Sequence, residues 1–522
     1  MTIHMIIQNT HSGFFFDEAT KEEQKNFEEL LIEKFTVLDT SMERDPRVIK
    51  GWLTPYKCFY DKENKIIPTG LMPFAKIYAQ KNNFELKVHD KRKFPKFNED
   101  LLSTIEKGDT WSFGKYKIGV NEEREYQAHT LLAIKKYKCG IANLPTSAGK
   151  TLILASLFTL LKCKSICVFN SIELIRQTKD ELVREFGFNE KDVGVVGEGI
   201  NEGDRKYVLL SMMSYQNMFS EYPDVGAVIM DEVHSTGRTN VAEKILYCCQ
   251  RAPIRIGLSA TANVIENPYE QMRLYANVGP VIIKREMKEQ IDKGILANTK
   301  VIMHTLPNTQ IPIVGSWIDI YEKRKFKQPK TPAKNKELRE AFKKEGWEFI
   351  KEGGQEYVRK FIGYGDESVL YIHNKERNKK IAELAKEYER VLILFNKLPH
   401  GEILHKLIPG SILIYGKHNK EERERAKKEL KENKDAVVIA SSIFNVGVNI
   451  PAIANLIVAS VNVSKVAVIQ KSGRAVRVDS STGKFHATIH DFAQYNNSIA
   501  TKQTEKRVKI YKNTMGLPVE YK

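Results

Sequence analysis

Short runs of apolar, mostly β-branched residues recur along the body of this 522-residue chain and alternate with longer amphipathic stretches. The clearest runs are Ser165–Phe169, Val225–Met230, Val391–Phe395, Ala436–Ala440 and Asn455–Ala459. Apolar runs of this length between helices are typical of parallel strands that are covered on both faces. The pattern therefore predicts an α/β protein with two parallel-sheet units, one over residues 113–295 and one over residues 375–522.

The segments outside these two units differ from each other in charge. Residues 1–110 hold 17 basic and 18 acidic side chains, and we interpret residues 1–112 as a small α+β accessory domain. Residues 296–374 are interpreted as a basic linker or an inserted helical subdomain. Within them, Tyr321–Lys360 carries 13 basic and 7 acidic side chains and is too long for an ordinary linker. A charged helix that only faces solvent would explain the same residues equally well.

Charge and composition narrow the classes of function. The formal net charge of +17 suits a polyanionic partner such as a nucleic acid. No apolar run approaches the ~20 residues that a membrane span needs, and the first residues do not form a signal peptide. Six cysteines without a CxxC pair indicate reduced thiols rather than a zinc site. We therefore expect no membrane contact and a cytoplasmic location, which is the host cytoplasm if the protein is phage-encoded.

The segment Ile141–Thr151 combines a short strand, a turn of small residues and the start of a helical run. The turn residues Pro145, Thr146, Ser147, Ala148 and Gly149 offer backbone N–H groups that can surround a di- or triphosphate. Lys150 can place its charge on the β- and γ-phosphates, and the Thr151 hydroxyl can ligate Mg²⁺. The segment predicts a nucleotide-binding loop, although Leu144 stands where the usual GxxxxGK[ST] pattern has its first glycine.

Two acidic residues follow a buried strand, 81 residues after Lys150. Val228–Met230 leads into Asp231 and Glu232, which places both acids at the carboxyl edge of a parallel sheet, where ligands of such folds bind. Asp231 can hold Mg²⁺, and Glu232 can orient and deprotonate the attacking water. This pair predicts hydrolysis of the bound nucleotide.

Tyr126 and Gln127 precede the loop by about one helix. A glutamine side chain can pair with the N6/N7 edge of adenine, and a neighbouring aromatic ring can cover the base. The two residues therefore favour ATP over GTP, although a single glutamine is most often an ordinary surface residue.

The order of these and further elements resembles that of superfamily 2 helicases and nucleic-acid translocases over about residues 120–515. Asn170–Gln177 is similar to motif Ia, Ser259–Thr261 is the SAT motif III, Ser441–Pro451 resembles motif V, and Gln470–Arg477 resembles motif VI. The resemblance implies two RecA-like lobes that hold ATP and Mg²⁺ between them. Asn449 stands where motif V often has Asp. This difference weakens the contact that the resemblance implies between motif V and either the ribose or the neighbouring lobe.

The resemblance assigns roles residue by residue. It implies that five residues take part in catalysis, with Arg477 as the arginine finger: Lys150, Glu232, Gln470, Arg474 and Arg477. It implies that Gly447 and Asn449 bind the nucleotide together with the loop residues. It also implies that His234, Ser259 and Thr261 couple the nucleotide to the nucleic-acid strand. It implies that seven further residues contact the nucleic-acid backbone independently of sequence: Ser171, Arg176, Gln177, Ser214, Gln216, Ser441 and Ser442.

A more specific resemblance includes the N-terminal region. Asp45–Trp52, Phe59–Asp61 and Ile67–Leu71 are similar to the small domain that precedes the motor in phage UvsW-type helicases. This family implies ATP-driven unwinding or branch migration of single-stranded, forked or junction DNA in replication and recombination, by a monomer. The alternatives are an RNA helicase, the motor of a restriction system, and a non-catalytic protein that clamps junctions when ATP binds.

Overall fold

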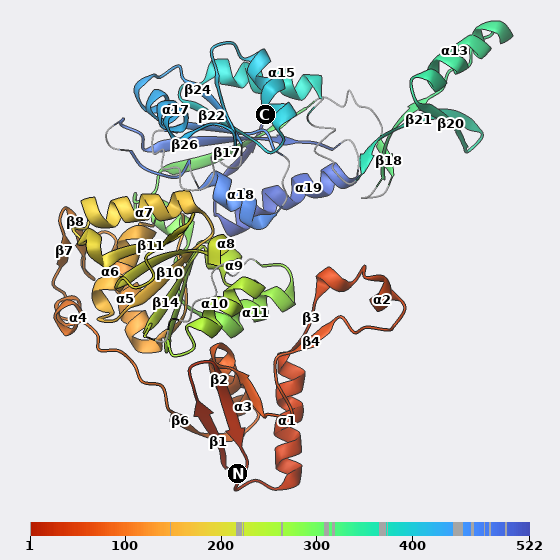
Figure 1. The fold of residues 1–522 in the computed structure, drawn as a ribbon. Helices are drawn as coiled ribbons and strands as arrows, with labels where there is room; N and C mark the ends of the chain where they lie inside the picture. Colours follow the sequence, from red (N-terminus) through yellow and green to blue (C-terminus); the bar gives the residue numbers. More distant parts are fainter. Residues whose placement is uncertain are drawn as a thin grey trace. The chain divides into compact units, whose positions relative to one another are not determined.

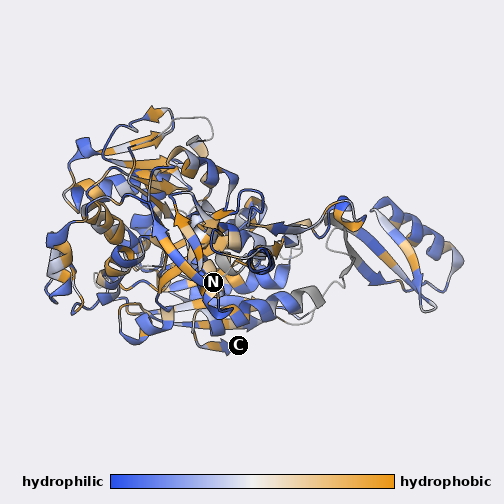
Figure 2. Cartoon of the chain, turned by 90° about the horizontal axis from the view of Figure 1, so that it is seen from below, coloured by the Kyte–Doolittle hydropathy of each residue, from blue (hydrophilic) through white to orange (hydrophobic). Residues whose placement is uncertain are grey.

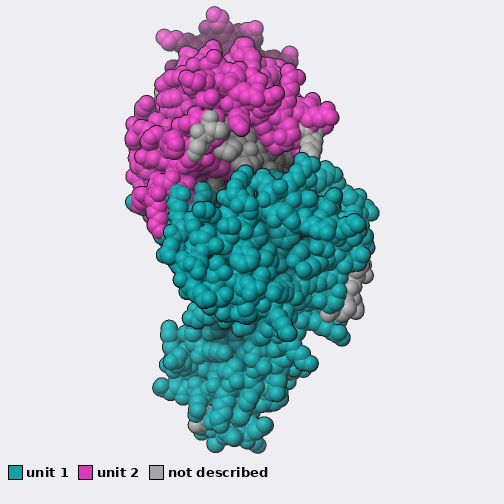
Figure 3. Space-filling view, turned by 90° about the vertical axis from the view of Figure 1, so that its left-hand side faces the viewer, with its two compact units in different colours: residues 1–290 teal, residues 291–522 magenta. Residues whose placement is uncertain are grey.

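The structure, a computed structural model, folds as two compact units, residues 1–290 and residues 291–522 (Figure 3). It describes residues 2–522 except residues 147, 216–221, 223, 263–264, 307–312, 316–318, 365–371, 373, 442–452, 461–463, 474, 480–481 and 496–497. In both large sheets the central strands are predominantly hydrophobic (Figure 2). The predicted α/β class with two parallel sheets is confirmed.

The first unit begins with a small α+β domain. Its sheet has the order β5-β2-β1-β6, in which only β1 and β6 are parallel. The elements are β1 (Thr2–Ile7), β2 (His11–Phe15), α1 (Lys21–Phe35), β3 (Thr36–Leu38), α2 (Pro46–Ile49), β4 (Tyr56–Cys58), β5 (Ile66–Pro68), α3 (Met72–Lys81), β6 (Glu85–Asp90) and α4 (Glu99–Glu106).

The core of this domain continues into the next one. Ala276 is one of the buried residues of its hydrophobic cluster, and Tyr275 packs against that cluster. At Gly70 an added Cβ would lie 2.1 Å from the Tyr275 carbonyl oxygen, so the backbones approach too closely for any other residue. The accessory domain is therefore packed directly on the following lobe, within one unit.

The rest of the first unit is built on an eight-stranded sheet of order β12-β11-β13-β10-β14-β15-β9-β16, in which only the β11–β12 pair is antiparallel. Helices α5 and α6 lie on one side of it and α10 and α11 on the other (Figure 1). The strands of the sheet are β9 (Cys139–Asn143), β10 (Ser165–Phe169), β11 (Val193–Gly197), β12 (Ile200–Asn201), β13 (Tyr207–Ser211), β14 (Ala227–Asp231), β15 (Ile254–Ser259) and β16 (Val281–Lys284), and β7 (Trp111–Phe113) and β8 (Tyr116–Ile118) form a separate antiparallel pair. The helices are α5 (Glu125–Tyr137), α6 (Lys150–Leu160), α7 (Ile172–Arg184), α8 (Met212–Tyr215), α9 (Val233–Thr236), α10 (Asn240–Cys248), α11 (Pro268–Val278) and α12 (Met287–Asp292).

The second unit is built on a seven-stranded parallel sheet of order β23-β24-β22-β25-β26-β17-β27. Its strands are β17 (Asn298–Thr305), β22 (Val391–Phe395), β23 (Ile412–Ile414), β24 (Val437–Ser441), β25 (Asn455–Val458), β26 (His486–Ala493) and β27 (Val519–Tyr521). Its helices are α15 (Lys375–Glu387), α16 (Leu398–Leu407), α17 (Lys420–Glu432), α18 (Lys465–Ser472) and α19 (Ser498–Lys509).

The segment 296–374, expected to be a linker or a helical insertion, differs from that expectation in two ways. Strand β17 pairs with β26 over its whole length, so the second sheet starts at Asn298 and not near residue 375. The remainder forms a small antiparallel sheet of order β18-β19-β21-β20 with one helix, which we call the inserted subdomain (residues 313–364). It contains β18 (Ile313–Gly315), β19 (Asp319–Lys325), α13 (Pro332–Lys344), β20 (Trp347–Glu352) and β21 (Gln355–Tyr364).

The inserted subdomain has its own hydrophobic core. Phe326, Trp347 and Val358 are buried together, and Phe342 of α13 and Phe349 of β20 pack against them. The aromatic rings meet edge to face, as Phe326 and Phe349 do at 4.9 Å between centroids. Within the described part of the chain, no helix has both the length and the apolar composition to cross a bilayer.

Candidate active site

Three strands of the first sheet bring the predicted site residues to one edge. Strands β14, β15 and β9 are parallel neighbours, and their registers pair Asp231 with Leu258 and Ser259 with Asn143. Because all three strands run in the same direction, Asp231, Ser259 and Asn143 reach the same carboxyl edge. The predicted loop starts there, directly after Asn143.

The loop after β9 is held by two side chains of α5. The Tyr126 hydroxyl and the Gln127 amide nitrogen both donate to the Ala148 carbonyl oxygen, at 3.1 and 3.0 Å. Gly149 has a φ of 75°, and a Cβ on it would lie 2.8 Å from the Gln127 nitrogen. Tyr126 and Gln127, which the sequence linked to adenine, therefore fix the loop that precedes α6.

Helix α6 begins at Lys150 and is apolar on all sides, because the core surrounds it. Its first residues therefore have a fixed position at the edge of the sheet, although the helix carries no acidic side chain in its first turn. In the preceding loop, the Thr146 hydroxyl is buried and accepts or donates no hydrogen bond within the described residues. An orphaned hydroxyl beside a helix N-terminus fits a phosphate oxygen.

Side chains from α6, β14, α9 and β15 form one connected chain at this edge. The Lys150 ammonium lies 2.6 Å from Glu232 Oε1, and Glu232 Oε2 lies 3.3 Å from His234 Nδ1. His234 Nδ1 is 2.8 Å from Ser259 Oγ, which also accepts a 3.0 Å bond from the Thr261 backbone N–H. The structure thus joins five residues that the sequence assigned separately to catalysis and to coupling.

The two acids of this edge have opposite electrostatic environments. Burial, and then the charge of Glu232, raises the pKa of Asp231 above its ordinary value. Burial alone would raise the pKa of Glu232 as well, but Lys150 and His234 hold it below its ordinary value. Glu232 is therefore anionic at neutral pH, and the crowded Asp231 carboxyl gains most from a neighbouring cation.

The fit of this edge to Mg²⁺ can be tested on the ligands present. Within the described residues there is no group of three or more His, Cys, Asp or Glu side chains that would hold a metal by themselves. A hydroxyl at Thr151 and a buried carboxyl at Asp231 match the way in which Mg²⁺ binds with one or two protein ligands and substrate phosphates. The residues fit an ion that arrives with a nucleotide.

Of the residues expected to contact a nucleic acid, Ser171 is the N-cap of helix α7, Arg176 and Gln177 lie within α7, and several already have partners. Ser171 Oγ donates to Glu173 at 2.7 Å, and Arg176 forms an ion pair with Glu198. Gln177 donates to Glu181 at 2.6 Å. Ser214 lies on α8, and the buried Ser441 hydroxyl at the end of β24 makes no hydrogen bond within the described residues.

In the second unit, two buried lysines that the sequence analysis did not select contact the region of motif VI: Lys471 lies within the motif and Lys484 follows it. Lys484 Nζ donates to the Ala475 and Arg477 carbonyl oxygens, both at 2.6 Å. Lys471 Nζ donates to Asn396 Oδ1 at 3.1 Å and to Ser460 Oγ, which follow β22 and β25. Burial lowers the pKa of Lys484 to about 7 and that of Lys471 to about 8.

These lysines hold the segment between Gln470 and Arg477 against the sheet. The short bridge between Asp479 and Lys484 turns the chain back so that the Lys484 ammonium reaches the carbonyls before it. A lysine 14 residues after Gln470 has no recognisable spacing, so its role follows only from the fold. Ser147, Gln216, Ser442, Gly447, Asn449 and Arg474, also predicted as site residues, lie outside the described residues.

Comparison with known proteins gives two family matches. The family described as the res subunit of type III restriction enzymes matches residues 121–264, and the helicase conserved C-terminal domain matches residues 367–479. They cover the nucleotide-binding edge of the first sheet and most of the second sheet. The chain is therefore a superfamily 2 helicase with two RecA-like lobes, and its class of enzyme is ATP-dependent DNA helicase.

Single relatives agree with this class. The DNA 3'-5' translocase XPB2 of Sulfurisphaera tokodaii is 25% identical over 379 residues, 68% of this chain and 79% of the relative. The ATP-dependent DNA helicase uvsW of Enterobacteria phage T4 is 22% identical over 455 residues, 82% of this chain and 79% of the relative. Within superfamily 2 the chain is close to the UvsW-type helicases.

A solved structure shares the fold. A fragment of a putative HsdR subunit of a type I restriction enzyme from Vibrio vulnificus YJ016 superposes with a TM-score of 0.51 at 14% identity, over 81% of this chain and 71% of that one. This likeness concerns the fold alone. It agrees with the two parallel sheets described above.

Proposed function

We propose that this helicase uses ATP with Mg²⁺ to translocate on DNA, and that it unwinds or branch-migrates forks and junctions. The observation that carries the proposal is the connected chain from Lys150 through Glu232 and His234 to Ser259. A protein that only bound a nucleotide would not need a partly buried, anionic acid beside the phosphate-binding lysine. The proposed monomeric state and the proposed sequence-independent grip on DNA follow from the UvsW-type resemblance.

The residues of the first lobe divide the work of hydrolysis. Lys150 neutralises Glu232 at 2.6 Å, and a triphosphate on the loop offers the ammonium a second anionic partner. Glu232 then becomes available to orient a water and accept its proton. Mg²⁺, when bound through Thr151 and Asp231, supplies positive charge to the phosphates during transfer.

His234 and Ser259 connect this acid to motif III. Glu232 has left-handed backbone angles, φ 44° and ψ 52°, which turn its side chain back toward Lys150 and His234. A change at the phosphates is therefore transmitted by hydrogen bonds to Ser259 and Thr261, at the end of the neighbouring strand β15. We propose this path as the coupling of the nucleotide state to the grip on DNA.

The test is phosphate release by the Glu232→Gln variant, with single-stranded DNA, forks, four-way junctions and RNA as activators. We expect turnover to fall by roughly 10³-fold or more, because the general base and its orientation are lost together. Forks and junctions should activate the wild-type protein more than RNA does. Wild-type turnover of the variant would remove Glu232 as the base, and stronger activation by RNA would favour an RNA helicase.

A second candidate, the motor of a restriction system, is favoured by the match of residues 121–264 to a restriction subunit. The two candidates differ in what the isolated chain does. A branch-migration helicase resolves a four-way junction by itself, whereas a motor subunit hydrolyses ATP on duplex DNA without separating the strands. Junction unwinding by the purified chain therefore decides between them.

A further inference from the structure

The inserted subdomain carries a run of positive charge without any acidic residue. Residues 323–336, KRKFKQPKTPAKNK, contain seven basic side chains and no Asp or Glu. They cover the end of β19, the connecting loop and the start of α13. Six of the seven are exposed, including Arg324, and we call the five exposed lysines, Lys325, Lys327, Lys330, Lys334 and Lys336, the lysine strip.

The lysine strip differs from three other cations of the subdomain, which have acidic partners. Elsewhere in it, Lys323 pairs with Glu352, Arg339 with Glu356 at 2.5 Å, and Arg359 with Glu348 at 2.8 Å. No residue of the strip forms an ion pair within the part of the chain that the structure describes. The positive charge of the strip is therefore not compensated by the protein itself.

The start of α13 adds to this charge. The first turn of the helix has no acidic residue, and the N-cap Thr331 makes no side-chain capping bond. Lys334 lies in that turn, at the positive end of the helix dipole, where a cation is unfavourable. A lysine at this position does not stabilise the helix. A bound anion would offset the repulsion between the lysine and the positive end of the helix dipole.

The aromatic side chains of the subdomain do not accompany the strip. Phe326 and Trp347 are buried, and Tyr357 is half-buried beneath the Lys323 ammonium, 4.4 Å from its ring. Among the side chains described between residues 323 and 360, none of the aromatic ones is exposed. Single strands are held largely by stacking of bases on aromatic rings, whereas duplex DNA is held by charges on its phosphates.

We propose that the lysine strip binds the phosphate backbone of duplex DNA, independently of sequence. The proposal rests on the proposed function only in taking DNA as the polymer. Exposed lysines without acidic partners contact phosphates as point charges and read no bases.

The test is the salt dependence of binding to a duplex of roughly 30 base pairs, measured with the full chain. One variant changes all five strip lysines to Gln. The matched control changes five other lysines of the same unit to Gln, each of which forms an ion pair: Lys300, Lys379, Lys380, Lys427 and Lys428. Both variants lose the same net charge, so only the position of the charge differs.

We expect the slope of log Kobs against log salt to become shallower by about 4 for the strip variant, near 0.9 for each phosphate that the strip no longer neutralises. The control should change it by less than about 1. Equal slopes for the two variants would overturn the proposal. An equal loss of affinity for a single strand of the same length would overturn the assignment to duplex DNA.

Two further measurements distinguish phosphate binding by the lysine strip from a folding defect and from a failure of the proposed function. Changing the five lysines to Arg should restore the wild-type slope, which excludes a folding defect, and failure to restore it would count against phosphate binding. Hydrolysis of ATP without DNA should be unchanged in the strip variant, because none of its residues belongs to the nucleotide site. Loss of the slope with intact hydrolysis supports the strip, whereas a wild-type chain without any hydrolysis would refute only the proposed function.

Discussion

In the first lobe, Lys150 and Glu232 at the carboxyl edge of the sheet bond to charged side chains, whereas in the second lobe the buried Lys484 bonds to the backbone. Lys150 pairs with Glu232, which in turn reaches His234. Lys484 instead donates to two carbonyl oxygens, those of Ala475 and Arg477. The first arrangement prepares side chains for chemistry, and the second fixes the position of a segment that carries an arginine.

This difference has a consequence for how each lobe responds to mutation. A change in the first lobe removes a charge that the reaction itself needs, so its effect on turnover is large. A change in the second lobe displaces a group that remains present, so its effect is smaller and falls on geometry. The following predictions test this distinction, beginning with the largest effect.

Lys150→Ala should lower ATP hydrolysis by roughly 10³-fold or more, because the loop loses its positive charge on the phosphates. Binding to DNA at low salt should remain, since Lys150 lies at the start of α6, at the nucleotide edge. Phosphate release and a binding titration measure the two effects. The control is Lys162→Ala, which removes an exposed lysine just after the same helix. Undiminished hydrolysis would mean that the loop does not bind phosphate.

Lys484→Met should lower kcat by roughly 10- to 100-fold with little change in the KM for ATP, because the segment carrying Arg477 loses two hydrogen bonds and shifts. Lys512→Met, at an exposed position of the same unit, is the control. A purely structural role of Lys484 would lower the amount of folded protein without changing kcat per folded molecule. An unchanged kcat would therefore show that the two lobes do not differ in the way described.

The second lobe should also lose stability as the pH falls. Its buried histidines His304 and His490 lie 3.0 Å apart, and burial lowers the pKa of His304 to about 4 and that of His490 to about 3. In the unfolded chain both titrate near 6.5, so between these values the unfolded state binds more protons. The free energy of unfolding should therefore fall, by on the order of 5 kcal/mol, as the pH is lowered from about 6.5 to about 4.

Hydrogen exchange followed separately in the two units measures this effect. His490→Gln should make the pH dependence of the second unit weaker, because one of the two depressed titrations is removed. The first unit serves as the internal control in the same sample. The same pH dependence in both units would contradict the assignment to the histidine pair.

Ser259→Ala should have the smallest effect on hydrolysis itself. It removes the oxygen that His234 and the Thr261 N–H share, at 2.8 and 3.0 Å, without touching Lys150 or Glu232. We expect DNA to stimulate the ATPase several-fold less than in the wild type, roughly 3- to 10-fold, for the loss of one buried hydrogen bond. Ser103→Ala, whose hydroxyl donates only to the nearby Asp100 carbonyl, is the control. A fall in the DNA-free rate with intact stimulation would place Ser259 in catalysis and not in coupling.

The sequence predicted the first lobe well because its site depends on strand ends. Once Val228–Met230 and Ile141–Asn143 are taken as parallel strands, Asp231 and the loop must reach one edge of the sheet. The motifs therefore give the positions of their side chains without further information. The hydrogen bonds from Tyr126 and Gln127 to Ala148 were not predicted. The local sequence of a helix does not decide whether its side chains contact a nucleotide base or a neighbouring loop.

The second lobe was harder to predict because its decisive contacts are distant in sequence. Strand β17 pairs with β26, almost 190 residues later, and nothing in its local pattern says which sheet it joins. Lys471 and Lys484 are buried although lysine is usually exposed, and only the surrounding fold decides that. The β-structure of the inserted subdomain was missed because the charged residues around Trp347 and Val358 conceal a small core.

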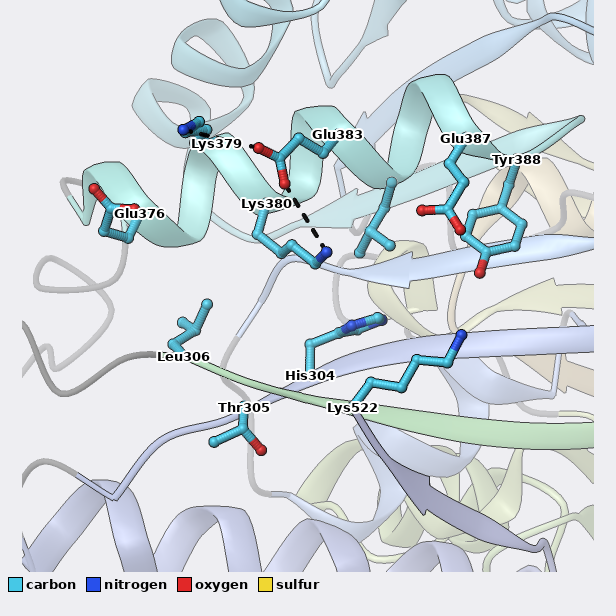
Figure 4. A pocket seen from close by; sticks show the side chains of 11 residues that line it. His304, Thr305, Leu306, Glu376, Lys379, Lys380, Glu383, Glu387, Tyr388 and Lys522 are labelled. Atoms are coloured by element: carbon cyan, nitrogen blue, oxygen red, sulfur yellow. Dashed lines mark ion pairs between the residues drawn. The ribbon is translucent and has the colours of Figure 1, made fainter.

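The inserted subdomain leaves and rejoins the second lobe at one place. Thr305 and Leu306, where the chain departs from β17, and Glu376, where it enters α15, line the same pocket of about 440 Å³ (Figure 4). Since both attachment points are adjacent, a brief peptide should span them, and the lobe's sheet would keep all its strands. The motor and its lysine-bearing appendage are thus separable modules, which an engineer can exchange for another recognition element.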